Sequence, residues 1–132
     1  MSYHVTILNS AHGKLVPIDF HRARVAASEL GWVVTEGPPT FEIRREEDIC
    51  TLWYTDGELW TKSPGQWELE QMLALATKLG ARVRGDEYET YSSPNQSYSH
   101  PDDVRLQKED EARSLELLRS DPLSSEKIRY YI

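Results

Sequence analysis

The chain has 132 residues, 39% of them hydrophobic, and 22 acidic against 15 basic residues give a formal net charge of −7. This length suits one domain with a core of its own. A surface this acidic repels phosphate backbones, which disfavours direct nucleic-acid binding and favours a basic protein partner. The need for solubility explains the same charge, so both explanations stay open.

The sequence predicts a cytoplasmic protein that does not enter a membrane. No apolar run approaches the roughly 20 residues that a membrane-spanning helix needs. Residues 1–10 lack the basic start and apolar run of a secretory signal. A single cysteine, Cys50, excludes an internal disulfide and fits a reducing compartment, where we expect it to pack as a small apolar residue inside a strand.

The N-terminal part predicts a strand, a helix and a second strand. Residues 3–8 are rich in β-forming residues, and residues 9–16, which include a glycine, are expected to form a loop. Asp19 is the expected N-cap of a helix that ends at Gly31, and residues 32–35 form a short strand. The apolar face of this helix has helical spacing and consists of Phe20, Ala23, Ala27 and Leu30.

A β-hairpin is predicted in the middle of the chain. Residues 40–44 alternate as a strand with one buried face, and a break follows at 45–48. Residues 49–54 and 59–62 are joined by Asp56-Gly57, a dipeptide that favours a two-residue hairpin turn.

This turn fixes the register of the hairpin. Trp53 then lies opposite Trp60 on one face of the sheet, while the other face carries Leu52, Tyr54 and Leu59. If the leucine side is the core, the two tryptophans are exposed and suit an interface anchor. If the tryptophan side is the core, they are packing residues, and the sequence leaves both alternatives open.

A second helix and two further strands follow the hairpin. Ser63-Pro64 predicts the start of the helix, and Gly80 predicts its end. Short strands are expected over residues 81–84 and 88–91. The apolar stripe of the helix is formed by Leu69, Met72, Leu73, Ala76 and Leu79.

The composition changes after residue 91. Residues 92–101 are rich in serine, proline and amides and predict a linker, whereas residues 102–132 are charged and predict a helical extension with a tail. We therefore expect an α+β core domain over residues 1–91, with a mainly antiparallel sheet of five to six strands and two helices on one face. The C-terminal helical extension follows it.

No motif for catalysis, a cofactor or a metal is recognisable. The histidines lack ligand spacing, and nucleophile-elbow, phosphate-loop and dinucleotide-binding motifs are missing. Asp86, Glu87 and Glu89 form an acidic group, with Glu87 and Glu89 expected on one strand face. They are solvated turn residues, a protein-binding edge or the acid/base pair of a small enzyme. We favour a protein that is not an enzyme and holds neither cofactor nor metal.

The segment from Leu52 to Tyr91 resembles small bacterial immunity proteins. The motifs that carry the resemblance are GELWTKSP, MLALATKLGARV and RGDEYETY, and Ser2–Ile7 and Pro17-Ile18-Asp19 extend it over residues 2–91. These proteins are antitoxins of polymorphic toxin or contact-dependent growth inhibition systems. The resemblance implies a cytoplasmic protein that neutralises a cognate toxin domain by direct, non-catalytic binding.

For such a function the binding surface needs an aromatic anchor surrounded by charge. Carboxylates would imitate phosphate charge and cover a basic active site, such as that of a nuclease. An alternative is a homodimeric scaffold joined through the tryptophan side or the C-terminal helix, so the chain is expected to be a monomer or a homodimer. The candidate partner-binding residues are Glu46, Glu47, Asp48, Trp53, Trp60, Asp86, Glu87 and Glu89.

Overall fold

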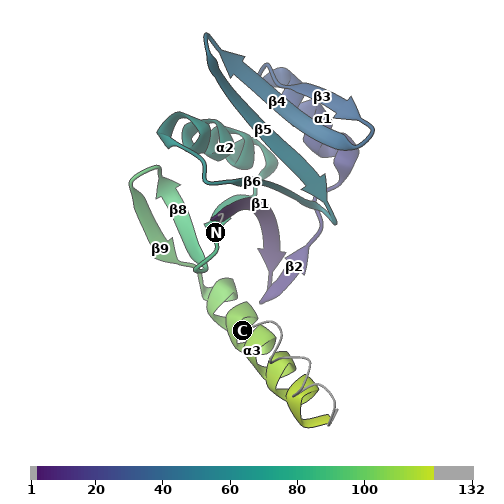
Figure 1. Ribbon diagram of the computed structural model, residues 1–132, viewed down its shortest axis with the longest axis vertical. Coiled ribbons are helices and arrows are strands. Elements are labelled where there is room, and N and C mark those ends of the chain that lie inside the picture. Colours follow the sequence, from purple (N-terminus) through teal and green to yellow (C-terminus); the bar gives the residue numbers. More distant parts are fainter. Residues whose placement is uncertain (1–2, 121–132) are drawn as a thin grey trace.

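In the computed structural model, which describes residues 3–120, nine strands form an antiparallel sheet with three helices (Figure 1). The strand order is β3-β4-β5-β6-β1-β7-β8-β9, and β2 pairs with β1. The strands are β1 (His4–Ala11), β2 (Lys14–Val16), β3 (Val33–Glu36), β4 (Pro39–Arg45), β5 (Asp48–Thr55), β6 (Glu58–Lys62), β7 (Arg82–Gly85), β8 (Glu89–Ser93) and β9 (Gln96–Ser99). The helices are α1 (Phe20–Glu29), α2 (Gln66–Leu79) and α3 (Pro101–Ser120).

The predicted fold class, α+β with a mainly antiparallel sheet, is confirmed, but the expected five to six strands are too few. Residues 9–16, expected as a loop, extend β1 and add β2 through a turn at His12-Gly13, where both residues have positive φ. Residues 92–101, expected as a linker, contain β9 in a hairpin with β8. Every residue of β2 and β9 is exposed, so neither strand has the apolar alternation that marks a half-buried strand.

The core lies between the sheet and the pair α1 and α2, which cover one face (Figure 1). Asp19 caps α1 as predicted, because its carboxylate accepts a hydrogen bond from the Arg22 N–H at 3.0 Å. Gly80 ends α2 in the left-handed conformation, as predicted. The largest fully buried apolar side chains of this core are Val5, Ile7, Phe41, Leu52, Leu59, Met72, Leu75, Leu79 and Val83.

The start of α2 differs from the prediction. The helix begins at Gln66 after Gly65, not at Ser63-Pro64. Ser63 has a φ of +45°, its N–H donates to the Tyr3 carbonyl at 2.6 Å, and its hydroxyl accepts from the Tyr3 N–H at 3.3 Å. The capping group that the sequence offers is therefore used to continue the pairing with the N-terminal strand.

The third helix lies on the opposite face of the sheet from α1 and α2. Side chains alternate along a strand, so Leu8 points away from the core that holds Ile7, and both Leu8 and Leu106 of α3 are buried outside that core. The helix α3 then extends beyond the sheet (Figure 1), and Val104 and Leu115 are exposed. The predicted tail falls within residues 121–132, which lie outside the described residues.

No helix within residues 3–120 has the length and apolarity needed to cross a membrane.

Cys50 is part of the core, as expected, with none of its surface exposed. Burial raises the pKa of its thiol to about 12. Because the thiolate is the reactive form, we expect a thiol reagent such as Ellman's reagent to leave the folded protein unmodified at pH 8 and to react once urea unfolds it. Rapid modification of the folded protein would contradict the buried position.

Candidate functional site

Two tryptophans stand side by side on the solvent side of the sheet. Trp53 pairs with Trp60 in the predicted register, and their ring centroids are 5.2 Å apart. Leu52 and Leu59 on the other side have no exposed surface, whereas Trp53 is 37% exposed. The alternative in which the tryptophans are core residues is therefore wrong, since the leucine side faces the helices.

A histidine extends this aromatic row. The His4 ring lies 5.5 Å from the Trp60 ring, and its Nδ1 atom is 3.6 Å from the Asp86 carboxylate. The His4 N–H also donates to Asp86 at 2.7 Å. On the other side, the Trp60 indole N–H donates to the Thr55 hydroxyl at 3.2 Å, which fixes the orientation of the ring. We call the surface formed by His4, Trp53, Thr55, Glu58, Trp60 and Asp86 the tryptophan face.

A depression of about 340 Å³ opens on the tryptophan face. Burial raises the pKa of the Glu58 carboxyl, Arg84 opposes this shift, and Asp56 adds to it. The depression is therefore a partly desolvated place with two carboxylates beside an indole ring. Its lining residues are His4, Thr55, Asp56, Glu58 and Trp60.

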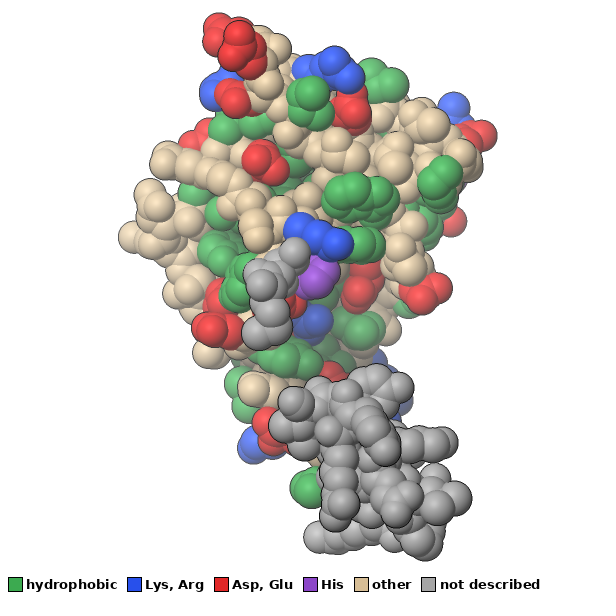
Figure 2. Space-filling model, viewed as in Figure 1, with side chains coloured by type: hydrophobic (Ala, Val, Ile, Leu, Met, Phe, Trp, Pro, Cys, Tyr) green, Lys and Arg blue, Asp and Glu red, His purple; other side chains and the backbone are tan. Residues whose placement is uncertain are grey.

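Three of the predicted binding residues lie elsewhere. Glu46 and Glu47 form the turn between β4 and β5, and Asp48 is the first residue of β5. This hairpin ends at the upper tip of Figure 1, where acidic side chains gather in Figure 2. Asp48 is five residues before Trp53, about 17 Å along a strand. The hairpin tip and the tryptophan face are therefore separate surfaces.

The acidic group of Asp86, Glu87 and Glu89 is not assembled into one site. Asp86 belongs to the tryptophan face, and Glu87 is exposed in the turn between β7 and β8. Glu89 lies on the opposite side of the sheet, where its carboxylate accepts a hydrogen bond from the Tyr3 hydroxyl. The expectation that Glu87 and Glu89 share a strand face is wrong, because β8 begins only at Glu89, after Tyr88 with its φ of +64°.

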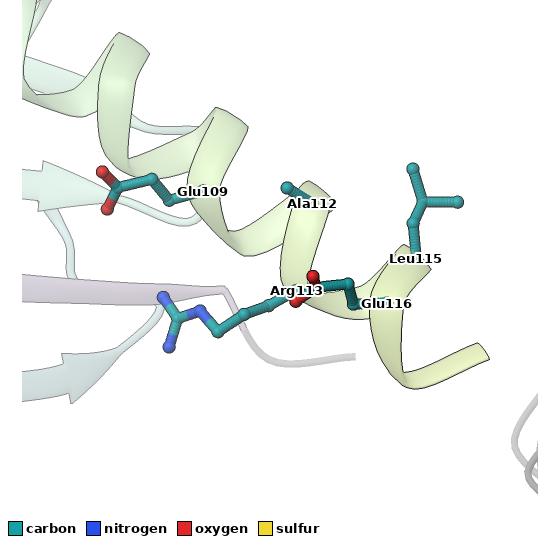
Figure 3. Close-up of a pocket in the computed structure, with 5 residues that line it drawn as sticks. All are labelled: Glu109, Ala112, Arg113, Leu115 and Glu116. Atoms are coloured by element: carbon teal, nitrogen blue, oxygen red, sulfur yellow. The ribbon is translucent and has the colours of Figure 1, made fainter. Parts of the chain in front are cut away.

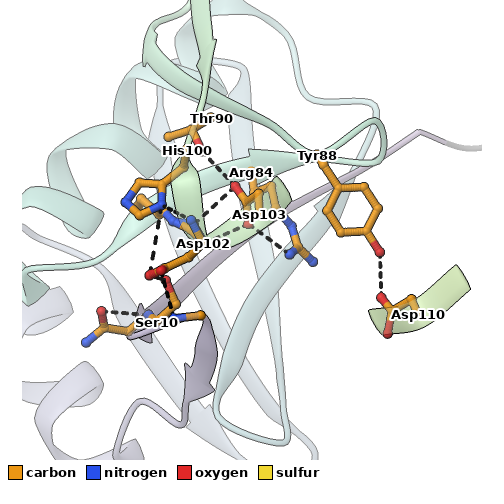
Figure 4. Close-up of polar contacts among 11 residues, drawn as sticks. Ser10, Arg84, Tyr88, Thr90, His100, Asp102, Asp103 and Asp110 are labelled. Atoms are coloured by element: carbon orange, nitrogen blue, oxygen red, sulfur yellow. Dashed lines mark hydrogen bonds and ion pairs between the residues drawn. The ribbon is translucent and has the colours of Figure 1, made fainter. Parts of the chain in front are cut away.

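A buried ion network joins α3 to the sheet, and sequence analysis did not find it. The Asp103 carboxylate is 1% exposed and accepts hydrogen bonds from Arg82 at 2.7 and 3.3 Å, from Arg84 at 3.3 Å and from the Thr90 hydroxyl at 3.1 Å (Figure 4). These partners alternate with core residues along β7 and β8. The alternation of charged and apolar residues along β7 was the sequence signal that could have predicted this network.

The next residue strengthens the same junction. Asp102 accepts from the Ser10 hydroxyl at 2.7 Å and from the Gly13 N–H at 2.8 Å, and the Ser10 hydrogen bond contributes most to lowering the pKa of its carboxyl (Figure 4). Further along the helix, the Tyr88 hydroxyl donates to Asp110 at 2.7 Å. The first turns of α3 are thereby tied to three strands, and we assign these contacts a structural role.

A larger depression of about 510 Å³ runs along α3, and among the described residues its lining consists of five side chains of that helix (Figure 3). Two of its charges already pair within the helix, Glu109 with Arg105 at 3.5 Å and Arg113 with Asp110 at 2.6 Å. Within residues 3–120, no three His, Cys, Asp or Glu side chains are grouped in a way that could hold a metal ion. The tryptophan face is therefore the best candidate site.

Comparison with known proteins returns no match: no protein family, no curated protein and no solved structure matches the chain.

Proposed function

We propose that this protein is an immunity protein of a polymorphic toxin or contact-dependent growth inhibition system, which neutralises a toxin domain by non-catalytic binding through the tryptophan face. The observation that carries the choice of surface is the contact between Trp53, which is exposed, and Trp60, which is half-buried, on the solvent side of the sheet. The toxin as partner rests on the resemblance of residues 2–91 to immunity proteins.

The position of the pair supports a binding role over a structural one. The opposite side of the sheet already supplies the core, so the fold gains little from two large aromatic side chains on the solvent side. Trp60 is held by the hydrogen bond to Thr55 and by its neighbours Trp53 and His4. A rigid aromatic surface loses little side-chain entropy when a partner covers it, and such residues dominate binding energies at protein interfaces.

The acidic groups next to the pair define the partner's charge. Asp56, Glu58 and Asp86 surround Trp60 and suit a basic surface, such as a nuclease active site. The hairpin tip, with Glu46, Glu47 and Asp48, is a second acidic surface. A large partner bound to the tryptophan face would contact this tip only with the rim of the interface. Glu89 faces the other side of the sheet and is therefore not part of the proposed binding surface.

The test is co-expression with the toxin domain encoded beside the gene, followed by measurement of the affinity. We expect protection of the cell, and Trp53→Ala or Trp60→Ala to weaken binding by at least about 2 kcal/mol, roughly 30-fold in Kd. Tyr98→Ala is the matched control, because Tyr98 is an exposed aromatic residue on β9, away from the pair. Loss of protection with the tryptophan variants should parallel the loss of affinity.

Two results would count against the proposal. A toxin that binds the tryptophan variants as tightly as the native protein would move the interface elsewhere. Failure to protect against any neighbouring toxin, together with a homodimer that Trp60→Ala separates into monomers in sedimentation, would favour the scaffold alternative, which uses the same exposed face.

A further inference from the structure

Two carboxylates line the depression of the tryptophan face. Asp56 belongs to the hairpin turn and Glu58 begins β6, and both line the depression. Within the described part of the chain, neither carboxylate has a hydrogen-bond or ion-pair partner. Glu58 is half-buried, whereas Asp56 is exposed. A carboxylate that loses water without gaining a partner is unfavourable, so a cation in the depression would stabilise Glu58.

Arg84 is the cation that acts electrostatically on Glu58, and it already has partners of its own. Arg84 opposes the rise in the pKa of Glu58, but its guanidinium lies 3.3 Å from Asp103 and 4.6 Å from the centroid of the Tyr88 ring. The other basic group at the depression, His4, faces Asp86. Arg84 and His4 therefore have carboxylates of their own. Lys62 follows Trp60 by two residues on β6 and is exposed, but it does not line the depression, so Glu58 and Asp56 remain available to a partner.

The third element of the depression is the indole ring of Trp60. Indole binds cations better than any other side chain does. The Trp60 ring lies between the rings of Trp53 and His4, and the hydrogen bond to Thr55 holds it where it lines the depression. Arginine suits such a place better than lysine. Its planar guanidinium stacks on an aromatic ring, pairs with carboxylates through two N–H groups and sheds water more easily than an ammonium group.

We propose that the depression receives an arginine side chain of the protein partner, with its guanidinium placed between the Glu58 carboxylate and the Trp60 ring. This inference rests on the proposed function for the identity of the partner, but the arginine site itself does not need the toxin. Asp56 stands at the rim of the depression and adds a second negative charge to the site.

The test uses the full chain labelled with ¹⁵N and a small probe, N-acetylarginine methylamide. We expect the probe to shift the signals of the Trp60 indole N–H and the Glu58 amide saturably, with a dissociation constant in the millimolar range. The neutral isostere N-acetylcitrulline methylamide should cause no such shift. Glu58→Gln should weaken the arginine probe by about tenfold, whereas Glu111→Gln, on the exposed face of α3, should leave it unchanged.

The outcomes separate this inference from the proposed function. Equal shifts with the citrulline probe, or unchanged affinity in Glu58→Gln, would overturn the arginine site even if toxin binding still depends on the tryptophans. A saturable arginine shift that Glu58→Gln removes would support the site even if no toxin is neutralised. A circular dichroism spectrum like that of the native protein shows that Glu58→Gln is folded.

Discussion

Replacing Asp103 with alanine is expected to destabilise the protein by about 3–5 kcal/mol, the usual cost of breaking a buried ion pair from one side. The Asp103 carboxylate is 1% exposed and pairs with both Arg82 and Arg84, whose side chains are 11% and 19% exposed. Without it, both guanidinium groups stay partly buried and lose their acceptor. The hydrogen bond from the Thr90 hydroxyl to Asp103 is lost at the same time.

Urea unfolding followed by the fluorescence of the four tryptophans measures this loss, and hydrogen exchange reports the opening of α3. Glu111→Ala removes an exposed carboxylate from the same helix and should change the free energy of unfolding by no more than about 0.5 kcal/mol. A loss below about 1 kcal/mol for Asp103→Ala, the value of an exposed ion pair, would show that water enters the network and screens it.

Replacing Gly57 with alanine is the second substitution with a large expected effect, on the order of 3 kcal/mol. Gly57 has a φ of +81°, where a side chain costs about 1–2 kcal/mol. A β-carbon there would also lie 2.5 Å from the Cβ and 2.6 Å from the Cα of Pro17. The turn packs against the start of α1, and the Ile18 N–H donates to the Gly57 carbonyl at 2.9 Å, so the clash cannot be relieved by a side chain alone.

The matched control for this substitution is Gly80→Ala. Gly80 also has a positive φ, +65°, but nothing lies within 4 Å of the position of its β-carbon. Its cost should therefore be the conformational term alone, about 1–2 kcal/mol, and the difference between the two variants measures the contact with Pro17. Equal losses in thermal or urea unfolding would show that the turn moves away from α1 without cost.

Local chemistry determined the elements that the sequence predicted correctly. Asp56-Gly57 readily adopts the left-handed conformations that a two-residue hairpin turn needs. The turn alone therefore fixed Trp53 opposite Trp60. Asp19 and Gly80 mark helix ends because a carboxylate and a missing side chain satisfy local requirements there. The cap predicted at Ser63 failed because a strand distant in sequence competes for the same hydroxyl.

The tertiary structure alone decided which side of the sheet is buried and which charges meet. Strand alternation is symmetric, so the tryptophan side and the leucine side were equivalent until α1 and α2 covered the latter. Glu87 and Glu89 were separated because Tyr88, which has a positive φ, interrupts the alternation between them. Conversely, Asp103 meets Arg82 and Arg84 only because α3 returns to the sheet. Contacts between distant segments depend on the whole packing, which no local pattern records.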